Sequence, residues 1–369
     1  MSHHVRPAGT TTQRPHRAAR YEDALNRRVA RWLSGRGWTV RIEPYVGYGS
    51  SAGWVRVLAR AVLAAPAVPD TDLPGAGTAT SEREARDVGA VRGWRSFATA
   101  QVPQARLEIE VGGRTFPAVA DRGGYVDTVV EADLSPGWHD VTVRSPGGAS
   151  QAVPVLVIDP ATPYGLVSDI DDTIMVTRLP RPLIAAWNSF VRHENAREPV
   201  AGMAALYRAL LTDRPDMPVI YLSTGAWNAA PTLGRFIRRH GYPVGPLMLT
   251  DWGPTNTGWF RSGQEHKNQT LRRLVADFPE MRWVLVGDDG QHDPEIYAGL
   301  VRERPDRVHA VVIRQLTGAE HVLAHGAPTS TEQADRAEGH TQAEGVPVVQ
   351  GADGRAILEE WRARGVTLP

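Results

Sequence analysis

Short apolar runs that each end in polar residues constrain the second half of this chain more than any other feature. From about residue 159 onward, four such runs alternate with segments of helical periodicity. Near-continuous apolar runs of this length are typical of buried parallel strands. The alternation therefore predicts an α/β fold in which helices cover a parallel sheet. The four runs are residues 165–169, 219–223, 283–288 and 308–313.

Acidic and hydroxyl residues occupy the carboxyl ends of these runs, where α/β folds place their ligand sites. The first run leads into the sequence SDIDDT at 168–173, the second into Ser223 and Thr224, and the third into GDDGQHD at 287–293. Carboxylates that converge on one edge of a sheet repel each other unless a cation lies there, and oxygen ligands favour a hard cation such as Mg²⁺. Each of these residue types also caps helices and turns loops, so no single one of them establishes a site.

Lysine usage marks one further position. Of 41 basic residues 40 are arginine, and Lys267 is the only lysine. A lysine presents a compact point charge, whereas an arginine presents a wide planar fork, so a crowded site that holds a phosphoryl oxygen and a carboxylate favours lysine. We expect Lys267 in the first turn of the helix before the third run; an incidental surface lysine remains the alternative.

The preceding region, residues 38–158, has strand periodicity. Residues 106–111 alternate polar with apolar, and pairs such as Gly112-Gly113 mark the turns between candidate strands. Short strands at this spacing predict a β-sandwich-like domain, immunoglobulin-like in outline. It contains no catalytic constellation, so we interpret it as a binding or packing module.

Residues 1–37 form a third region, an N-terminal arm followed by an amphipathic helix. Apolar residues recur at helical spacing between Tyr21 and Leu33, and arginines such as Arg20 and Arg28 line the other face. Such a helix lies either on an anionic membrane surface or on its own protein, and we favour the second. The predicted domains are therefore 1–37, 38–158 and 159–369.

Composition excludes several classes of function. The chain has 369 residues, no cysteine and a formal net charge of zero. Without cysteine there is no disulfide, thiolate nucleophile or cysteine-bound zinc. No apolar run approaches the length of a membrane span, and the neutral balance argues against nucleic-acid binding. We expect a cytoplasmic protein with no transmembrane segment, peripheral at a membrane at most.

These motifs resemble those of the haloacid dehalogenase superfamily, in the same order. Asp169 and Asp171 match its first motif, Ser223 the second, Lys267 the third, and Asp288 with Asp293 the fourth. The block from Phe278 to Tyr297 looks like the catalytic domain of the actin-patch-protein type of phosphatidate phosphatase, and the resemblance covers 159–369. Two departures are the Thr-Gly-Ala-Trp after Ser223 and the aspartate at 289 where a serine is expected.

The resemblance implies a Rossmann-like fold of haloacid dehalogenase type and a Mg²⁺-dependent phosphatase that forms an aspartyl-phosphate. Asp169 would be the nucleophile and Asp171 the general acid and base. Ser223, Thr224 and Lys267 would hold the phosphoryl group, with Thr173 fixing the loop beside it. The implied metal ligands are Asp169, Asp288 and the backbone carbonyl of Asp171, with Asp293 in the outer shell and Asp289 either a ligand or a bystander.

The expected substrate is phosphatidate or a related phospholipid at a membrane surface. Residues 174–200 leave room for only a small flap, and Trp227, Trp252 and Trp259 lie in loops on the expected side of the sheet. These tryptophans either contact lipid or pack at the rim. Two alternatives stay open, a phosphatase for a soluble phosphomonoester or phosphoprotein and a non-catalytic lipid-sensing domain.

Overall fold

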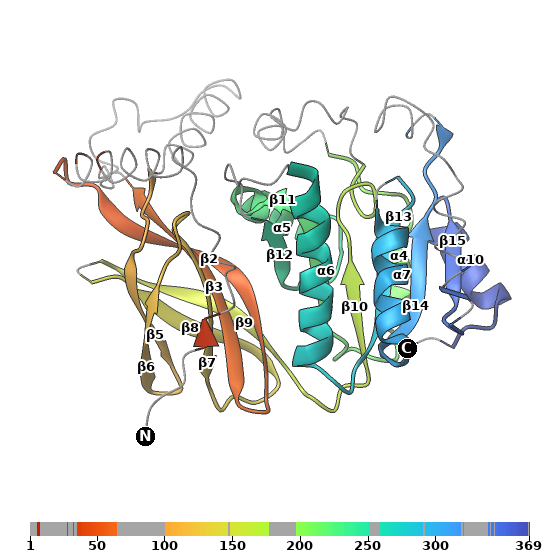
Figure 1. Ribbon diagram of the computed structural model, residues 1–369, viewed down its shortest axis with the longest axis horizontal. Helices are drawn as coiled ribbons and strands as arrows, with labels where there is room; N and C mark the ends of the chain where they lie inside the picture. Colours follow the sequence, from red (N-terminus) through yellow and green to blue (C-terminus); the bar gives the residue numbers. More distant parts are fainter. Residues whose placement is uncertain are drawn as a thin grey trace, which may run out of the picture. The chain divides into compact units, whose positions relative to one another are not determined.

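Two compact units make up the chain, Met1–Val157 and Ile158–Pro369 (Figure 1). We describe them from a computed structural model. The residues that it describes are 6–7, 28, 32, 35–64, 100–146, 148–176, 197–250, 259–290, 292–318, 320, 339, 341–342, 344–367 and 369. The predicted N-terminal amphipathic helix lies outside these residues except for a few isolated positions.

The first unit is a nine-stranded sheet. Its strand order is β1-β7-β3-β2-β9-β8-β5-β6, with β4 paired to β3. The hydrogen bonding joins all of these strands into one sheet, and the division into two packed sheets stays a prediction. The strands are β1 (Arg6–Pro7), β2 (Thr39–Ser50), β3 (Trp54–Ala64), β4 (Ala100–Gln101), β5 (Arg106–Val111), β6 (Arg114–Val119), β7 (Tyr125–Glu131), β8 (Gly137–Arg144) and β9 (Ser150–Ile158).

Strand β5 illustrates why this region folds as a sheet. Its residues alternate between exposed and buried, and Leu107, Ile109 and Val111 enter the apolar core. The hairpin to β6 closes at Gly112 and Gly113, whose φ angles of 56° and 73° favour glycine. The predicted alternation and its glycine turn are confirmed.

The second unit is built on a six-stranded sheet of order β12-β11-β10-β13-β14-β15, and every neighbouring pair in it is parallel. Helix α6 packs beside α7, in front of the sheet in Figure 1, and α4 packs beside α10. The α/β class predicted from the sequence is confirmed. The strands are β10 (Tyr164–Ser168), β11 (Val219–Ala226), β12 (Leu247–Thr250), β13 (Arg282–Asp288), β14 (Val308–Arg314) and β15 (Val348–Gly351). The helices are α4 (Met203–Leu211), η4 (Trp227–Ala229), α5 (Ala230–Arg239), α6 (Trp259–Asp277), α7 (Asp293–Glu303), η5 (Pro305–Arg307) and α10 (Gly354–Ala363).

The four apolar runs all form strands of this sheet, and the sequence missed only its two edges. β12 and β15 have four residues each, too few for a distinct periodicity. The position of Lys267 was predicted wrongly. Helix α6 begins at Trp259, so Lys267 lies in its middle instead of its first turn. The first turns of α6 mix apolar and polar residues, contain Gly263 and gave no helical pattern.

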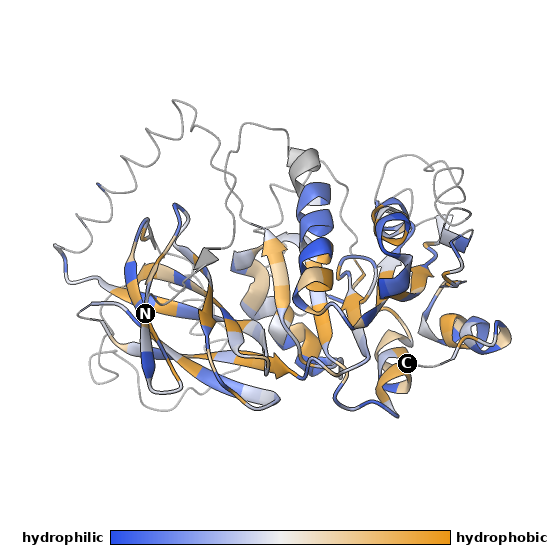
Figure 2. Ribbon diagram, turned by 60° about the horizontal axis from the view of Figure 1, so that its bottom comes forward, coloured by the Kyte–Doolittle hydropathy of each residue, from blue (hydrophilic) through white to orange (hydrophobic). Residues whose placement is uncertain are grey.

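Hydropathy follows the layers of the second unit. In Figure 2 the central strands are mostly orange, while the solvent side of α6 is blue. Among the described residues, no helix has the length and apolar character needed to span a bilayer.

Candidate functional site

The site lies at the carboxyl ends of two adjacent central strands. Asp169 directly follows β10, and Asp288 is the last residue of β13. Numbered along the chain, the strand order of this sheet is 3-2-1-4-5-6. Strands 1 and 4 of that order are β10 and β13, where the connections diverge and leave a crevice for a ligand.

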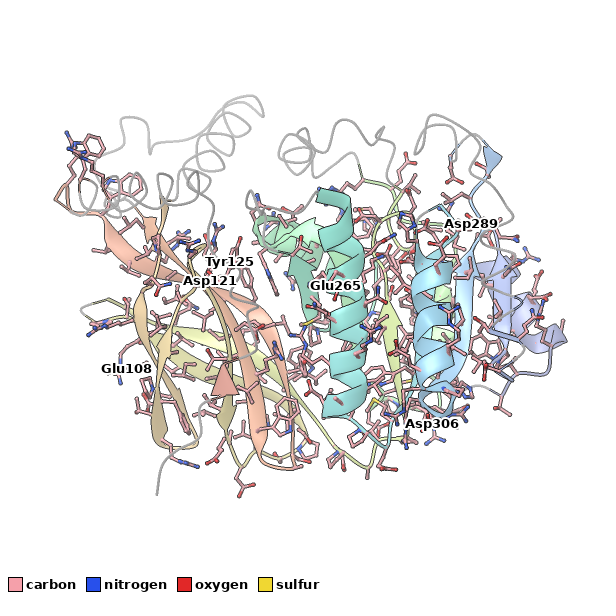
Figure 3. All side chains as sticks on the ribbon, viewed as in Figure 1. Glu108, Asp121, Tyr125, Glu265, Asp289 and Asp306 are labelled. Atoms are coloured by element: carbon pink, nitrogen blue, oxygen red, sulfur yellow. The ribbon has the colours of Figure 1, made fainter. Side chains whose placement is uncertain are left out.

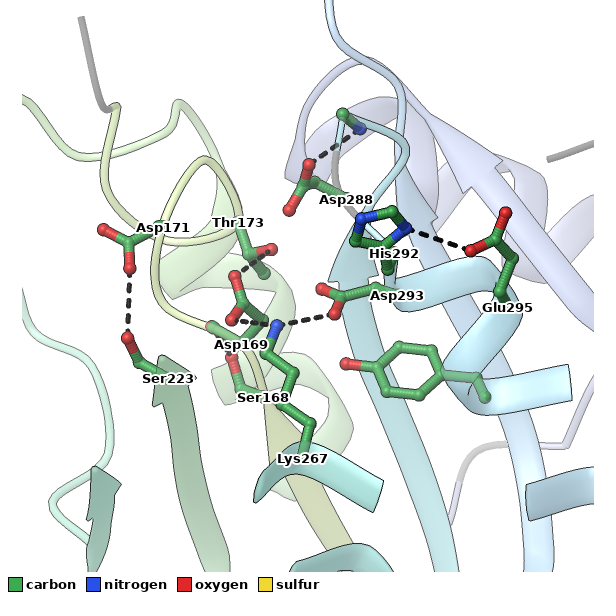
Figure 4. Close-up of polar contacts among 12 residues, drawn as sticks. Ser168, Asp169, Asp171, Thr173, Ser223, Lys267, Asp288, His292, Asp293 and Glu295 are labelled. Atoms are coloured by element: carbon green, nitrogen blue, oxygen red, sulfur yellow. Dashed lines mark hydrogen bonds and ion pairs between the residues drawn. The ribbon is translucent and has the colours of Figure 1, made fainter. Parts of the chain in front are cut away.

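A buried lysine joins two aspartates in this crevice. The Nζ atom of Lys267 donates to Asp169 Oδ1 at 2.6 Å and to Asp293 Oδ1 at 2.6 Å (Figure 4). The three side chains are at most 3% exposed. They come from the first loop, from α6 and from the start of α7, so the fold brings together three of the predicted motifs.

Asp288 completes a group of three carboxylates suited to a cation. One oxygen from each of Asp169, Asp288 and Asp293 lies within 4.8 Å of the others. Asp288 Oδ1 accepts from the backbone N–H of Gly290 at 2.8 Å. Within the described part of the chain, Asp288 Oδ2 and Asp293 Oδ2 are buried without a hydrogen-bond partner. Buried oxygens of this kind need a partner, and a hard divalent cation that prefers oxygen ligands fits them.

The electrostatics agree with that fit. Burial raises the pKa of Asp169 well above its usual value, and the charges of Asp293 and Asp171 add to this effect while Lys267 opposes it. Burial likewise raises the pKa of Asp288, helped by Asp293 and Asp169. Burial alone would lower the pKa of Lys267, but the adjacent Asp169 and Asp293 outweigh it and raise the pKa, so the lysine stays charged. If all three carboxylates are ionised, one ammonium leaves two negative charges, which a dication would neutralise.

Asp171 and Ser223 form a separate pair. Ser223 Oγ donates to Asp171 Oδ2 at 3.0 Å and accepts from the N–H of Gly225 at 2.9 Å, and both side chains are buried. Figure 4 shows this pair beside the lysine-centred cluster, on the β11 side of the first loop. The carboxylate of Asp171 lies outside the group of three, as expected if only its backbone carbonyl were a metal ligand.

The remaining predicted site residues lie at the edges of this arrangement. Thr173 Oγ1 donates to Asp169 Oδ2 at 3.3 Å, which ties the loop to this carboxylate. Thr224 is half-buried, and its carbonyl accepts from Thr250 Oγ1 at 2.8 Å. Asp289 Oδ1 accepts from the N–H of Leu316 at 2.8 Å, so this carboxylate binds the segment that follows the neighbouring strand β14.

The tryptophans and the flap are mostly outside the described residues. This holds for Trp252, the side chain of Trp259 and residues 177–196 of the expected flap. Trp227 is half-buried in η4.

The sequence analysis missed supporting residues beneath the cluster. Ser168 Oγ donates to the carbonyl of Asp169 at 2.6 Å and lies 2.6 Å from the hydroxyl of Tyr207. A Cβ atom at Gly287 would lie 2.5 Å from Asp293 Oδ2, so this position admits no side chain. The sequence did contain signals for both residues: Ser168 is a polar residue at the end of an apolar run, and Gly287 directly precedes the acidic block.

Comparison with known proteins finds a family match within the second unit, Ile158–Pro369. Residues 164–315 match the family described as phosphatidate phosphatase APP1, catalytic domain. The phosphatidate phosphatase APP1 of Saccharomyces cerevisiae is 27% identical over 205 residues, which are 54% of this chain and 35% of the yeast protein. An uncharacterised Schizosaccharomyces pombe protein is 24% identical over 160 residues, 41% of this chain and 25% of its own length. The chain therefore spans about a third or less of the curated relatives that it matches.

A solved structure that covers more of the chain is much less similar. A carbohydrate acetylesterase from Xanthomonas citri aligns over 89% of this chain and 75% of its own, with 13% identity and a TM-score of 0.31. The predicted resemblance to the actin-patch-protein type of phosphatidate phosphatase is confirmed over residues 164–315, and the predicted enzyme class, phosphoric monoester hydrolase, is the class of that family.

Proposed function

We propose that this chain is a phosphatase of haloacid dehalogenase type that removes the phosphate from phosphatidate or a related phospholipid. The observation that carries the proposal is the buried contact of Lys267 with Asp169 and Asp293 beside Asp288. An aspartate next to a fixed ammonium and two further carboxylates suits a nucleophile that meets an anionic phosphate. The family match over residues 164–315 supports the same reaction class.

Mg²⁺ is the proposed cofactor. Asp169 and Asp288 would hold it, together with the backbone carbonyl of Asp171. Asp293 would orient the outer shell through the oxygen that Lys267 leaves free. When bound, the cation would screen the negative charges of nucleophile and substrate from each other.

The chain's own residues would carry out the reaction in two steps. An oxygen of Asp169 attacks phosphorus, and the bond to the leaving alkoxide breaks as Asp171 donates a proton to that oxygen. Asp171 then accepts a proton from water, whose oxygen attacks the aspartyl-phosphate, releases inorganic phosphate and restores Asp169. The ammonium of Lys267 would bind the phosphoryl oxygens in both steps, and the hydroxyl of Ser223 would bind them after its proton turns from Asp171 to the substrate.

The family match supports the lipid substrate, the geometry of the site does not select it, and the location is an expectation from the sequence. A phospholipid monoester would be reached at a membrane surface, which fits a cytoplasmic protein in peripheral contact with the bilayer. A soluble phosphomonoester or phosphoprotein would meet the same catalytic groups, and a lipid-sensing domain would not need Asp171.

Phosphate release separates these alternatives. Purified protein is incubated with phosphatidate vesicles or with a panel of soluble phosphomonoesters, in Mg²⁺ and again in chelator, with Asp169→Asn as the inactive reference. We expect release from the vesicles in Mg²⁺ alone. Equal rates on lipid and soluble esters would refute the lipid assignment, and turnover unchanged by chelator would refute the metal. Release no greater than that of Asp169→Asn would leave the lipid-sensing role.

A further inference from the structure

Among the aspartates of the two acidic motifs, 168–173 and 287–293, the proposed reaction gives no part to Asp172 and Asp289. Both bind one short segment at the end of β14. The N–H of Asp289 donates to the carbonyl of Arg314 at 3.0 Å, and its carboxylate accepts from the N–H of Leu316. On the other side, Arg314 Nη1 donates to the carbonyl of Asp172 at 2.7 Å. Residues 314–316 therefore connect the loop after β10 with the loop after β13, the two loops that carry the carboxylate cluster.

The guanidinium of Arg314 is buried and held on three sides. Arg314 as a whole is only 5% exposed. Besides the carbonyl of Asp172, it binds the carbonyl of Ala352 through Nε at 3.2 Å and Glu320 Oε1 through Nη2 at 2.6 Å. The other oxygen of Glu320 accepts from the N–H of Thr317 at 2.8 Å, which fixes the carboxylate in turn. A planar guanidinium whose three nitrogens all have fixed partners cannot rotate freely. Because Arg314 ends β14, this strand fixes the position of the Asp172 carbonyl.

The carbonyl that Arg314 binds belongs to an unfavourable turn. Asp172 has a φ angle of 57°, in the left-handed region that costs free energy for a residue with a side chain. Its N–H donates to the carbonyl of Met175 at 2.8 Å, which closes the turn from the other side. Such a turn persists only where the surroundings hold it, and the bond from Arg314 is one of the contacts that do so.

This turn begins at the residue next to Asp171. The direction in which the chain leaves Asp171 is set at Asp172, while Ser223 binds the Asp171 carboxylate at 3.0 Å. The acid is thus held by its side chain from β11 and through its backbone from β14. Loss of the second support would leave the carboxylate in place on average but allow it to shift.

We propose that Arg314 is a positioning residue that aims the carboxylate of Asp171 at the leaving-group oxygen by holding the left-handed turn at Asp172. The inference rests on the proposed function, in which Asp171 is the general acid. It also gives Asp289 a part, because Asp289 fixes the backbone of residues 314 and 316 from which the guanidinium extends.

A comparison of leaving groups tests this role. An alkoxide needs a proton as it departs, whereas a phenolate needs one much less, so a misplaced acid slows alkyl phosphates selectively. The value of kcat/KM is measured for an alkyl phosphate and for an aryl phosphate whose ring carries an alkyl tail of the same length. Both are presented in the same mixed micelles with Mg²⁺. The ratio of the two values does not depend on the fraction of folded protein.

The variants are Arg314→Gln, Arg314→Lys, Asp171→Asn and a matched control, Arg282→Gln. Arg282 lies at the opposite end of β13, where its Nη2 donates to the carbonyl of Val308 at 3.3 Å. We expect Arg314→Gln to lose about 10- to 100-fold on the alkyl substrate and about threefold or less on the aryl one. Asp171→Asn should change the ratio further in the same direction, Arg314→Lys should fall between Arg314→Gln and the parent, and Arg282→Gln should keep the parent ratio.

The outcomes separate this inference from the proposed function. A parent protein that hydrolyses neither substrate removes the proposed function, and the inference with it. If the parent is active and Asp171→Asn shifts the ratio, but Arg314→Gln slows both substrates equally, only the inference fails. If Arg314→Gln does not fold, Arg314→Lys provides the same ratio, and failure of both to fold would make Arg314 a folding residue and overturn the proposal.

Discussion

One charged group from each unit of this chain shows a sharp contrast. In the nine-stranded sheet, Arg144 Nε meets Glu108 Oε2 at 3.0 Å with both side chains about half exposed, and Figure 3 labels Glu108 on the outside of its sheet. In the α/β unit, Lys267 meets Asp169 and Asp293 at 2.6 Å with almost no exposure. Exposed pairs contribute little to stability, whereas buried charges carry a large desolvation cost that the fold must offset. The cost of the buried cluster fits the proposed reaction centre, whereas the exposed pair fits a packing surface.

The largest expected effect is on activity. Asp169→Asn removes the attacking oxygen and should reduce phosphate release by about 10⁴-fold or more, because the remaining groups have no nucleophile to assist. Glu108→Gln, an acid-to-amide change in the first unit, is the control and should leave the rate unchanged. Equal losses in the two variants would show that the buried cluster has no special part in the chemistry.

The contrast in stability is tested by removing the cation of each pair. Lys267→Met leaves buried carboxylates without their ammonium, so the free energy of unfolding should fall by about 3–5 kcal/mol. Arg144→Met removes an exposed partner and should cost about 0–1 kcal/mol. Urea unfolding in Mg²⁺-free buffer measures both, and similar losses would contradict the distinction between the two units.

Metal binding should stabilise only the α/β unit. At a concentration a hundredfold above its Kd, Mg²⁺ should add about 2.7 kcal/mol to the stability of the parent protein. Asp288→Asn removes one of the three carboxylates and should abolish most of the rise in Tm, while Glu108→Gln should retain it. A rise of the same size in Asp288→Asn would place the cation elsewhere.

A buried histidine provides the smallest test. Burial lowers the pKa of His309 below its usual 6.5, although the carbonyl of Thr367 opposes the shift. Protonation therefore favours the unfolded chain, so the stability that the neutral ring contributes is present above about pH 6.5 and is lost as the pH falls below that value.

Stability measured between about pH 7 and pH 5 should consequently fall less steeply in His309→Gln than in the parent. An unchanged slope in His309→Gln would contradict the linkage.

Much of this arrangement could be read from the sequence because it depends on local patterns. Apolar runs predicted four of the six parallel strands, and the polar residues that end these runs, such as Asp169 and Ser223, lie at the carboxyl-end side of the sheet. The lone lysine was recognised from composition. Its place in α6 was missed, since the first turns of that helix show no helical periodicity.

Only the tertiary structure decided how the acids are divided. Asp169, Asp288 and Asp293 form one group. The carboxylate of Asp171 accepts from Ser223, and that of Asp289 accepts from the backbone that follows β14. Figure 3 shows Asp289 at the end of the second unit where β13 terminates. Neighbours in sequence such as 288 and 289 carry the same side chain and point in different directions, so residue type alone could not separate them.

The sequence by itself determined which chemical groups are present and at which strand ends, because strand periodicity and the α/β connection rules are local. The partners of those groups depend on contacts between distant segments, such as the bond from Lys267 to Asp169, which joins residues 98 positions apart, and the bond from Arg314 to Asp172, which joins residues 142 apart. Such contacts arise only when strands and helices pack, which is why the role of Asp172 became visible in the folded protein alone.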